Sequence, residues 1–588
     1  MSLQSSPLTI SNGLRYVASM RAPTFPHHAL LVRPHKGLLW RSCALGLAAT
    51  LALGCAGDKP SKDNVDDFPG PEFLDGPTIG PAQQRAPLSF VLSLQTDTDA
   101  SVTADLLEED GTLTVVNYTQ SGTDFELPLL GFKGNAVTQV TVHITDAQGT
   151  TTAAPIAVEP TLPNEWPDIE AVVSQPDKME PGYRLFSVRP ALFVNDNEFL
   201  MVADERGEIV WTLVPDEVIL DIKPFQNGNL LAVQEADDMV GGPVVEYTLL
   251  GDETSRWKSN AHAREGVIVD GIEGFHHDVI ALDNGDFMGL SKEPFFIENY
   301  HMSYVDRPVV APQTVSADII VSFTPSGEVL DTWRLSELLD PQRIGYDAID
   351  VTHSDGLYDW THANAIMLDP ADGNLVVSVR NQDAIIKIDV DTHELIWILA
   401  TPDNWNAEWM EFLLTPRGDL EWSFHQHGHD ISEDNRILVF DNGLQRASPF
   451  VDDPLPVSSR YSRVVEYEIF PDTLEVAQTW EFKDAGDGIL FSDLVGNARY
   501  LQQSGNVLGC FGYITSIGSV SMSTLGLGKK AIRIIEFSPG DPHEVVFDLK
   551  ITSDGGENSD GWVAYRAEYL ESLYPPDVAT VTRMLAAP

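Results

Sequence analysis

A short unit that recurs along the chain constrains the fold more than any other feature of the sequence. Each copy reads as an apolar strand, a tight turn of the Asn-Gly or Asp-Gly kind, a second apolar strand, and a further strand that often ends in Trp. Six such turns fall between residues 195 and 506. Radial repetition of short antiparallel strands leaves few strand edges exposed. The sequence therefore predicts an all-β protein with a six-bladed β-propeller, and we expect strands near residues 185–214 to close the ring with strands from the C-terminus.

The chain ahead of the repeats differs in composition. Residues 56–85 are rich in Pro, Gly and Asp without periodicity, which predicts a flexible tether. Residues 86–160 alternate apolar and polar residues between turn signals, as in a small β-sandwich. A Pro-containing linker at residues 161–183 is expected to lead into the propeller, which we assign to residues 184–588.

Residues 1–55 have the layout of an export signal. Basic residues precede a short apolar run that ends in small residues before Cys55, and the run is too short to span a bilayer. The ending LALGC resembles a bacterial lipoprotein signal, which implies lipidation of Cys55. We therefore expect an exported, membrane-anchored protein of the periplasm or cell envelope. Removal of Cys43 with the signal would leave Cys510 without a partner, so no disulfide is expected.

The charge of the chain excludes one class of partner. Acidic residues outnumber basic ones 88 to 36, giving a formal net charge of −52. Such a surface repels phosphate backbones, so no nucleic acid partner is expected. No cofactor is expected either, and the sequence leaves open whether the protein forms a homodimer.

Histidines gather just before the turn-bearing strand pairs, in FHHDVIALDNGD, WTHANAIMLDPADGN and FHQHGHDISEDNR. Equivalent positions of successive propeller blades converge on the central channel. We therefore expect either His276 or His277 to face His362 and His427 across one channel.

A metal site is one alternative interpretation of these histidines. His425, His427 and His429 together with His362 have side chains that could ligate zinc or copper. Strand alternation places residues two apart on one face, which could turn all three histidines of HQHGH to the same side. Acidic turns such as DPADGN miss the full calcium-loop pattern, so we expect solvated turns there.

Two longer segments resemble bacterial arylsulfate sulfotransferases. They are YDWTHANAIMLDPADGNLVVSVRNQDAIIKIDVDTHELIWILATPDNW and HQHGHDISEDNRILVFDNG. The resemblance continues through GFHHDV and AYRAEYLESLYP and covers roughly residues 85–580. It implies a small N-terminal β-sandwich ahead of a propeller, and a catalytic site at the mouth of the channel.

The same resemblance implies the role of individual residues. In the family a Gln-His pair thirteen residues before the Phe of FDNG supplies the nucleophile, and Gln426-His427 keeps that spacing to Phe440. The other implied site residues are a channel histidine at His362, an asparagine at Asn364, an arginine at Arg380 and a tyrosine at Tyr565. One more family histidine falls on HHD. If the strand that follows is aligned with the one after His362, this histidine is His276. If it is aligned with the one after His427, it is His277. That choice stays open.

The implied reaction moves a sulfuryl group from a phenolic sulfate ester to a phenol. A neutral imidazole can attack sulfur to give a sulfohistidine, so that donor and acceptor use the site in turn without a nucleotide sulfate. Arg380 and a protonated histidine would stabilise the charge that develops on the sulfuryl oxygens and on the departing phenolate. The alternatives are an exported propeller that only binds or adheres, and the histidine-ligated metalloprotein.

Overall fold

The computed structural model describes residues 70–163, 166–191, 198–235, 241–350, 356–518, 520–522, 529–540, 542–553 and 560–586. All of them belong to one compact unit, Phe68–Pro588. Strands dominate, and the helices of the described residues are one α-helix, α1 (Leu335–Leu338), and the 3-10 turns η1 (Pro176–Lys178), η2 (Arg380–Gln382) and η3 (Val457–Ser459). None of these helices is long and apolar enough to cross a membrane. The expected all-β class is confirmed.

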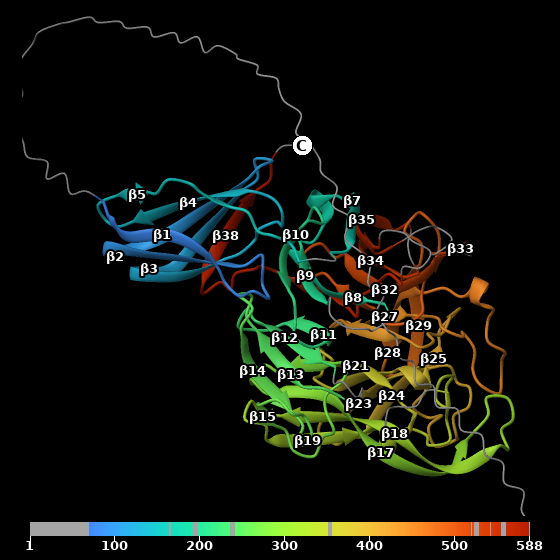
Figure 1. Cartoon of the computed structure of the whole chain (residues 1–588). Helices are drawn as coiled ribbons and strands as arrows, with labels where there is room; N and C mark the ends of the chain where they lie inside the picture. Colours follow the sequence, from blue (N-terminus) through green and yellow to red (C-terminus); the bar gives the residue numbers. More distant parts are fainter. Residues whose placement is uncertain are drawn as a thin grey trace, which may run out of the picture. The chain divides into compact units, whose positions relative to one another are not determined.

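The N-terminal region forms one seven-stranded sheet. Its strands are β1 (Phe73–Pro81), β2 (Phe90–Glu108), β3 (Leu113–Leu129), β4 (Thr138–Thr145), β5 (Thr150–Thr152), β6 (Ile156–Val158) and β38 (Ala579–Met584). Two boundaries expected from sequence are wrong. Strand β1 lies in the segment expected to be a tether and pairs with β2. Strand β38, expected in the propeller, pairs with β3, so the chain returns to its first sheet at its end (Figure 1).

The N-terminal sheet is held by strict alternation of its side chains. In β2, Val102, Ala104 and Leu106 are at most 2% exposed, while their neighbours face solvent or lie half-buried. Both halves of the long strands β2 and β3 contribute to one apolar core. Only one face of this sheet is buried, so apolar and polar residues alternate along its strands with a period of two. This is the alternation seen in the sequence.

Five further sheets carry the repeats. The first holds β8 (Tyr183–Pro190), β9 (Phe199–Ala203), β10 (Ile209–Leu213), β36 (Trp562–Val563) and β37 (Ala567–Leu570). The second holds β11 (Ile219–Pro224), β12 (Leu230–Gln234), β13 (Val244–Tyr247), β14 (Glu253–Lys258) and β15 (Val267–Ile268). The third holds β16 (Val279–Ala281), β17 (Phe287–His301), β18 (Val310–Phe323), β19 (Val329–Arg334) and β20 (Tyr358–Asp359). The fourth holds β21 (Ala363–Leu368), β22 (Leu375–Val379), β23 (Ala384–Ile388) and β24 (Leu395–Ala400).

The last of the five is a twelve-stranded sheet. It runs through β25 (Thr415–Pro416), β26 (His427–Ile431), β27 (Arg436–Asp441), β28 (Arg463–Phe470), β29 (Glu475–Phe482), β30 (Leu490–Ser492), β31 (Asn497–Tyr500), β32 (Val507–Ile517), β33 (Val520–Ser521), β34 (Ala531–Ser538), β35 (Glu544–Thr552) and β7 (Asp168–Ser174). A single parallel pair, Gly428 with Asn497, joins its two halves at β26 and β31. Because β7 pairs with β35, the segment expected to be a linker contributes an edge strand.

The turns that define the repeat lie where the sequence predicts them. In each case the residue before the turn donates a backbone hydrogen bond to the residue after it, as Phe225 does to Asn229 and Leu282 does to Asp286. Its own carbonyl oxygen accepts a hydrogen bond from a residue within the turn. The same closure occurs between Asp369 and Asn374, Ser432 and Arg436, and Leu501 and Asn506. These turns join the first two strands of successive sheets. The remaining turn of the predicted six falls at residues 195–198, largely outside the described residues.

The C-terminal strands close the arrangement. Strand β37 pairs with β8 from Ala567 opposite Phe186 to Leu570 opposite Tyr183, which confirms the expected pairing of early and late strands. Figure 1 shows the sheets following one another in chain order, with the strands of the last sheet beside those of the first. The arrangement is propeller-like, and it brings the first strands β16, β21, β26 and β31 next to one another.

Candidate active site

Four strands, β16 and β21 of two successive sheets and β26 and β31 of the two halves of the twelve-stranded sheet, each follow a residue with a left-handed backbone. The φ angles are 56° at His277, 49° at His362, 53° at His425 and 54° at Val495. Residues other than glycine rarely adopt this conformation, so its recurrence marks equivalent positions of the repeat. His277 is thus the counterpart of His362. His427 lies two residues beyond its own marker, as Asn364 does in β21.

His277 and His362 come together as ring neighbours. Their ring centroids are 4.7 Å apart in an edge-to-face arrangement, and Nδ1 of His277 lies 2.8 Å from Nδ1 of His276. His276 turns its other nitrogen, Nε2, toward Oδ1 of Asp318 at 3.2 Å. Desolvation, followed by the nearby His362, holds the pKa of His277 well below its usual range. Of the two candidates in HHD, His277 therefore faces the other histidines, and His276 lies behind it.

A chain of polar contacts connects His362 with Arg380. Nδ1 of His362 contacts the carboxylate of Asp359. The carbonyl oxygen of Asp359 accepts a 2.7 Å hydrogen bond from the amide of Asn381, and Oδ1 of Asn381 accepts one of 2.6 Å from Arg380. Arg380 also donates to Oδ2 of Asp347 at 3.0 Å. The residue Arg380 is only 5% exposed, and these contacts hold the plane of its guanidinium.

The protonation of His427 is fixed by Asn442. Nδ1 of His427 lies 2.7 Å from Oδ1 of Asn442. The amide nitrogen of Asn442 donates to the carbonyl oxygens of Ser492 and Val495, at 2.9 and 2.8 Å. Because both carbonyls can only accept, the amide cannot be reversed, and Oδ1 must accept a proton from Nδ1 of His427. Nε2 then carries the lone pair, and it has no hydrogen-bond partner among the described residues.

The surroundings of His427 also keep its ring neutral. Burial, followed by the positive charge of Arg380, holds the pKa of His427 well below its usual range. The hydrogen bond to Asn442 acts in the opposite direction and is too weak to reverse the shift. The ring is 3% exposed. At neutral pH, His427 therefore presents an unprotonated Nε2 within the electrostatic influence of Arg380.

Tyr565 lies between the two groups of histidines. Its ring centroid is 5.9 Å from that of His277 and 6.3 Å from that of His427. Its hydroxyl donates to the carbonyl oxygen of Asn364 at 3.4 Å. Burial raises the pKa of Tyr565, so the phenol keeps its proton. The amide of Asn364 donates to the carbonyl oxygen of Gln426 at 2.8 Å, which ties β21 to the segment that carries His427.

A fully buried arginine lies next to this group. Arg566 donates to the carbonyl oxygen of Asn364. It also lies 3.1 Å from a carboxylate oxygen of Asp221 and 3.1 Å from one of Asp278. Lys223 contacts Asp278 as well. Two cations and two carboxylates thus compensate one another in the low-dielectric interior, and Arg566 connects the site with three sheets.

The three histidines of HQHGH do not share one face. Strand β26 begins only at His427, so alternation does not extend to His425, and the register shifts between His427 and His429. His425 lies among carboxylates, whereas burial lowers the pKa of His429 to about 3. Among the described residues, no group of three or more His, Cys, Asp or Glu side chains is placed to hold a metal ion. In the acidic turn DPADGN, the ammonium of Lys387 binds Asp369 and Asp372.

Comparison with known proteins places this geometry in a family. The model of the arylsulfotransferase (ASST) family matches residues 169–566. The chain belongs to the arylsulfotransferase family. It is 27% identical over 387 residues to the arylsulfate sulfotransferase AssT of Escherichia coli O6:H1, covering 56% of this chain and 60% of that protein. It is also 27% identical over 409 residues to AssT of Lelliottia amnigena, covering 60% and 63%. The match thus spans somewhat less than two thirds of these relatives.

Solved structures add no argument. A protein from Lactobacillus plantarum aligns with 66% of this chain and 99% of its own length. Its identity to this chain is 11% and the TM-score is 0.33, which is too low to carry an inference.

In this member of the arylsulfotransferase family, sequence reasoning missed the residues that set the protonation of the site histidines. Asp347, Asp359, Asp383 and Asn442 all contact a site histidine or Arg380, yet none was singled out. One signal was available. Asn442 is the Asn of the FDNG motif, from which only the spacing to His427 was used. The others have no local pattern, since Asp347 lies in a loop, Asp359 ends the short strand β20, and Asp383 ends η2.

Proposed function

We propose that the protein transfers a sulfuryl group from a phenolic sulfate ester to a phenol through a sulfohistidine at His427. The observation that carries the proposal is the neutral His427 ring. Its Nδ1 proton is held by Asn442, its Nε2 has no hydrogen-bond partner among the described residues, and the charge of Arg380 acts on it. A nucleophilic imidazole must be unprotonated at the attacking nitrogen. Membership of the arylsulfotransferase family supports the same substrate class.

In the first displacement, Nε2 of His427 attacks sulfur. The N–S bond forms while the S–O bond to the phenol breaks, and the phenolate leaves with the electron pair of that bond. Arg380 keeps N–H groups that neither Asn381 nor Asp347 uses, and these can bind the sulfuryl oxygens. His362, oriented by Asp359, supplies the proton to the phenolate.

In the second displacement, the acceptor phenol reverses these steps. Its hydroxyl proton passes to His362 as its oxygen attacks sulfur, and the N–S bond breaks to return neutral His427. One proton and one sulfuryl group are therefore exchanged per cycle, with no nucleotide sulfate and no cofactor. The ring of Tyr565 lies near those of both His277 and His427, so we place either phenol next to these three rings.

The first prediction tests this two-step transfer. Protein mixed with an aryl sulfate alone is expected to gain one sulfuryl group, about 80 Da, on the peptide that contains His427, and to lose it when phenol is added. Peptide mass spectrometry after rapid quenching measures both steps. His427→Asn should remove the label, while His543→Gln, in the connection between β34 and β35, should keep it. Label that persists without His427 would overturn the mechanism.

We also infer the finer architecture. Each of the first four repeat sheets supplies one blade, and the twelve-stranded sheet supplies two because one residue pair joins its halves. Six blades would result. The seven-stranded sheet, whose long strands contribute both halves to one core, supports a small β-sandwich.

We further propose that Cys55 is lipidated and anchors the exported protein in the periplasm or cell envelope. Cys55 and the signal region lie outside the described residues, so the sequence of the signal is the support. As a second prediction, Cys55→Ala should move the protein from the membrane fraction to the soluble fraction, followed by immunoblot. Retention in the membrane would contradict the anchor. Whether the protein forms a homodimer is open to measurement by sedimentation.

A further inference from the structure

His425 is enclosed by hydrogen-bond acceptors. The residue is fully buried. Its Nδ1 lies 3.0 Å from Oδ1 of Asp383, and its Nε2 lies 3.2 Å from the carbonyl oxygen of Tyr346 and 3.5 Å from Oδ2 of Asp347. A neutral imidazole has one nitrogen that must accept a proton, and neither nitrogen of His425 faces a donor. Nδ1 makes no well-aligned hydrogen bond, but its nearest charged neighbour is a carboxylate. The two carboxylates, Asp383 and Asp347, therefore favour the charged ring, in which both nitrogens carry hydrogen.

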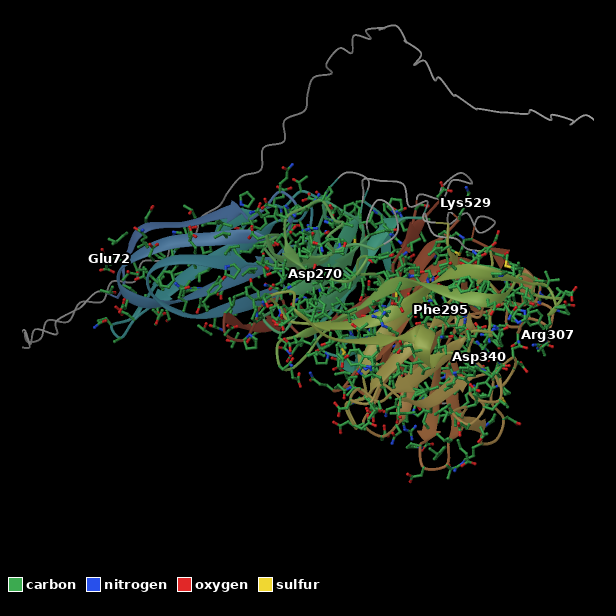
Figure 2. All side chains as sticks on the ribbon, turned by 90° about the horizontal axis from the view of Figure 1, so that it is seen from below. Glu72, Asp270, Phe295, Arg307, Asp340 and Lys529 are labelled. Carbon is green, nitrogen blue, oxygen red and sulfur yellow. The ribbon has the colours of Figure 1, made fainter. Side chains whose placement is uncertain are left out.

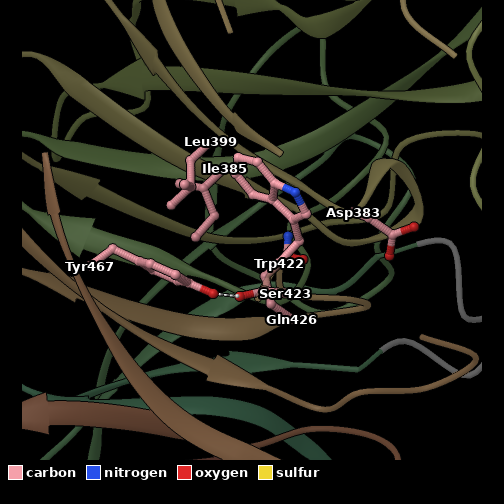
Figure 3. Close-up of a pocket in the computed structure, with 7 residues that line it drawn as sticks. All are labelled: Asp383, Ile385, Leu399, Trp422, Ser423, Gln426 and Tyr467. Carbon is pink, nitrogen blue, oxygen red and sulfur yellow. Dashed lines mark hydrogen bonds between the residues drawn. The ribbon is translucent and has the colours of Figure 1, made fainter. Parts of the chain in front are cut away.

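The two carboxylates around His425 are held by their own backbones. Asp347 and Asp383 have left-handed φ angles of 72° and 47°. Oδ1 of Asp383 accepts a 2.8 Å hydrogen bond from the backbone N–H of His425. Figure 3 shows Asp383 and Gln426 at the edge of a cavity of about 10 Å³, which is room for about one water molecule. Solvent therefore has little access to the ion pair from this side.

The loop that carries Asp347 is held at two places, by Asn406 and by Asn381 of η2. Asp340, labelled in Figure 2, accepts hydrogen bonds from the backbone and side-chain amides of Asn406, at 2.7 and 3.0 Å. The N–H of Gly345 donates to the carbonyl oxygen of Asn381 at 3.0 Å. A Cβ on Gly345 would come within 2.3 Å of that oxygen, so only glycine permits this approach. The loop thus delivers Asp347 to one fixed place.

Asp347 connects His425 to Arg380. The same oxygen, Oδ2, lies 3.5 Å from Nε2 of His425 and accepts a 3.0 Å hydrogen bond from the Arg380 guanidinium. Removing the charge of His425 would leave Asp347 with Arg380 as its remaining close cation, and Asp383 without a charged partner in this cluster. The carboxylate would then shift, and the guanidinium with it.

We propose that His425, as an imidazolium clamped between Asp383 and Asp347, is a positioning residue that fixes Arg380 for sulfuryl transfer. The proposal rests on the transfer function proposed above and adds a residue that does not touch the substrate. Sulfuryl transfer should therefore require His425 to be charged, while His427 must be neutral.

The charged groups that face His425 determine when it loses its proton. Asp383 and Arg380 face it from η2 and its end, Asp347 and Tyr346 face it from the loop ahead of β20, and His427 follows on its own segment. Burial alone would lower the pKa of His425, but the charge of Asp383 and the hydrogen bonds to both carboxylates raise it to about 9. The ring is therefore charged at neutral pH and becomes neutral above about pH 9.

The test measures the rate of sulfuryl labelling by rapid quench with donor alone, from pH 6 to 10.5, on the full chain. The donor is 4-nitrophenyl sulfate, which is ionised throughout this range. Its weakly basic phenolate leaves without a proton from His362, so neither the donor nor that acid step adds a titration. In the wild type the rate should fall as pH rises through about 9. His425→Gln should label roughly 10 to 100 times more slowly at pH 7.5, without that alkaline fall. Asp347→Asn removes one negative charge next to the His425 ring, so the decrease in labelling rate should occur at lower pH.

The control separates this proposal from folding and from the transfer function itself. His543 also faces acceptors with both nitrogens, the carbonyl oxygens of Ser538 and Glu481 at 3.1 and 2.8 Å, so His543→Gln matches the substitution and should keep the wild-type profile. A wild-type rate in His425→Gln, or an unchanged alkaline fall in His425→Gln or Asp347→Asn, would overturn the positioning role. If the wild type takes up no label at any pH, it is the transfer function that fails. Should His425→Gln not fold, as judged by its melting curve, the shift in Asp347→Asn decides the question.

Discussion

Two sides of the candidate site treat equally buried imidazoles in opposite ways. On the charged side, His425 lies between Asp347 and Asp383, with Arg380 attached to Asp347. On the neutral side, His427 meets the amide of Asn442, whose nitrogen is bound by two backbone carbonyls. The pKa of His425 rises to about 9, and that of His427 falls well below its usual range. Burial is common to both, so the partner at hydrogen-bond distance decides the charge.

This contrast has a functional meaning for a transferase of the proposed kind. The nucleophile must offer a lone pair, whereas the group that fixes the arginine must keep its charge. The two histidines lie only two residues apart, and they differ in charge because His425 contacts carboxylates and His427 contacts an amide. Substitutions that exchange or remove these partners should therefore change one side without the other.

The largest expected effect concerns stability on the charged side. His425 has a folded-state pKa raised from 6.5 to about 9. Its contribution to the free energy of unfolding is thus fully present below about pH 6.5 and lost as pH rises through about 9. The difference amounts to about 3 kcal/mol at most. Urea unfolding at pH 6 and pH 10 should show the wild type losing more stability than His425→Gln over this interval. Equal losses would mean that the imidazolium is not held as the geometry indicates.

Arg380→Lys should break the connection between the two sides. Lysine keeps the charge but cannot contact Asn381, Asp347 and the sulfuryl oxygens in one plane, so transfer should slow by roughly 100-fold. The fall should be in kcat more than in KM for the donor, since the planar guanidinium matters most when charge develops. Arg417→Lys, whose guanidinium pairs with Glu475 on an exposed edge, serves as the control and should leave the kinetics unchanged.

Asn442→Asp should make the surroundings of His427 resemble those of His425, with a carboxylate next to the ring. A carboxylate beside Nδ1 favours the imidazolium form of His427, so the pKa of His427 should rise. The rate of labelling should then fall about tenfold at pH 6 and recover as pH increases, because only unprotonated Nε2 attacks. Asn442→Ala would lose the proton acceptor without adding charge and should slow labelling without moving the profile. A pH profile identical in Asn442→Asp and the wild type would refute the role given to Asn442.

Much of the fold could be predicted because its signals are local. The Asn-Gly and Asp-Gly turns mark the first hairpin of successive sheets, since those residues tolerate the backbone that a tight turn needs. Strand β38 and strand β7 could not be assigned in this way. Each pairs with a strand hundreds of residues away in sequence, and nothing in a short strand records its partner.

The sequence by itself determined most of the side chains that gather at the site, because His362, Arg380, His427 and Tyr565 follow from the repeat and the family resemblance. It left His276 and His277 as alternatives. Only the tertiary structure decided what each imidazole does. Strand alternation could not separate His425 from His427, because the strand begins at His427 and a left-handed residue precedes it. The charge of a buried imidazole depends on the donor or acceptor within about 3 Å of each nitrogen. Those partners, Asp347, Asp383 and Asn442, come from separate loops that only the folded chain brings together.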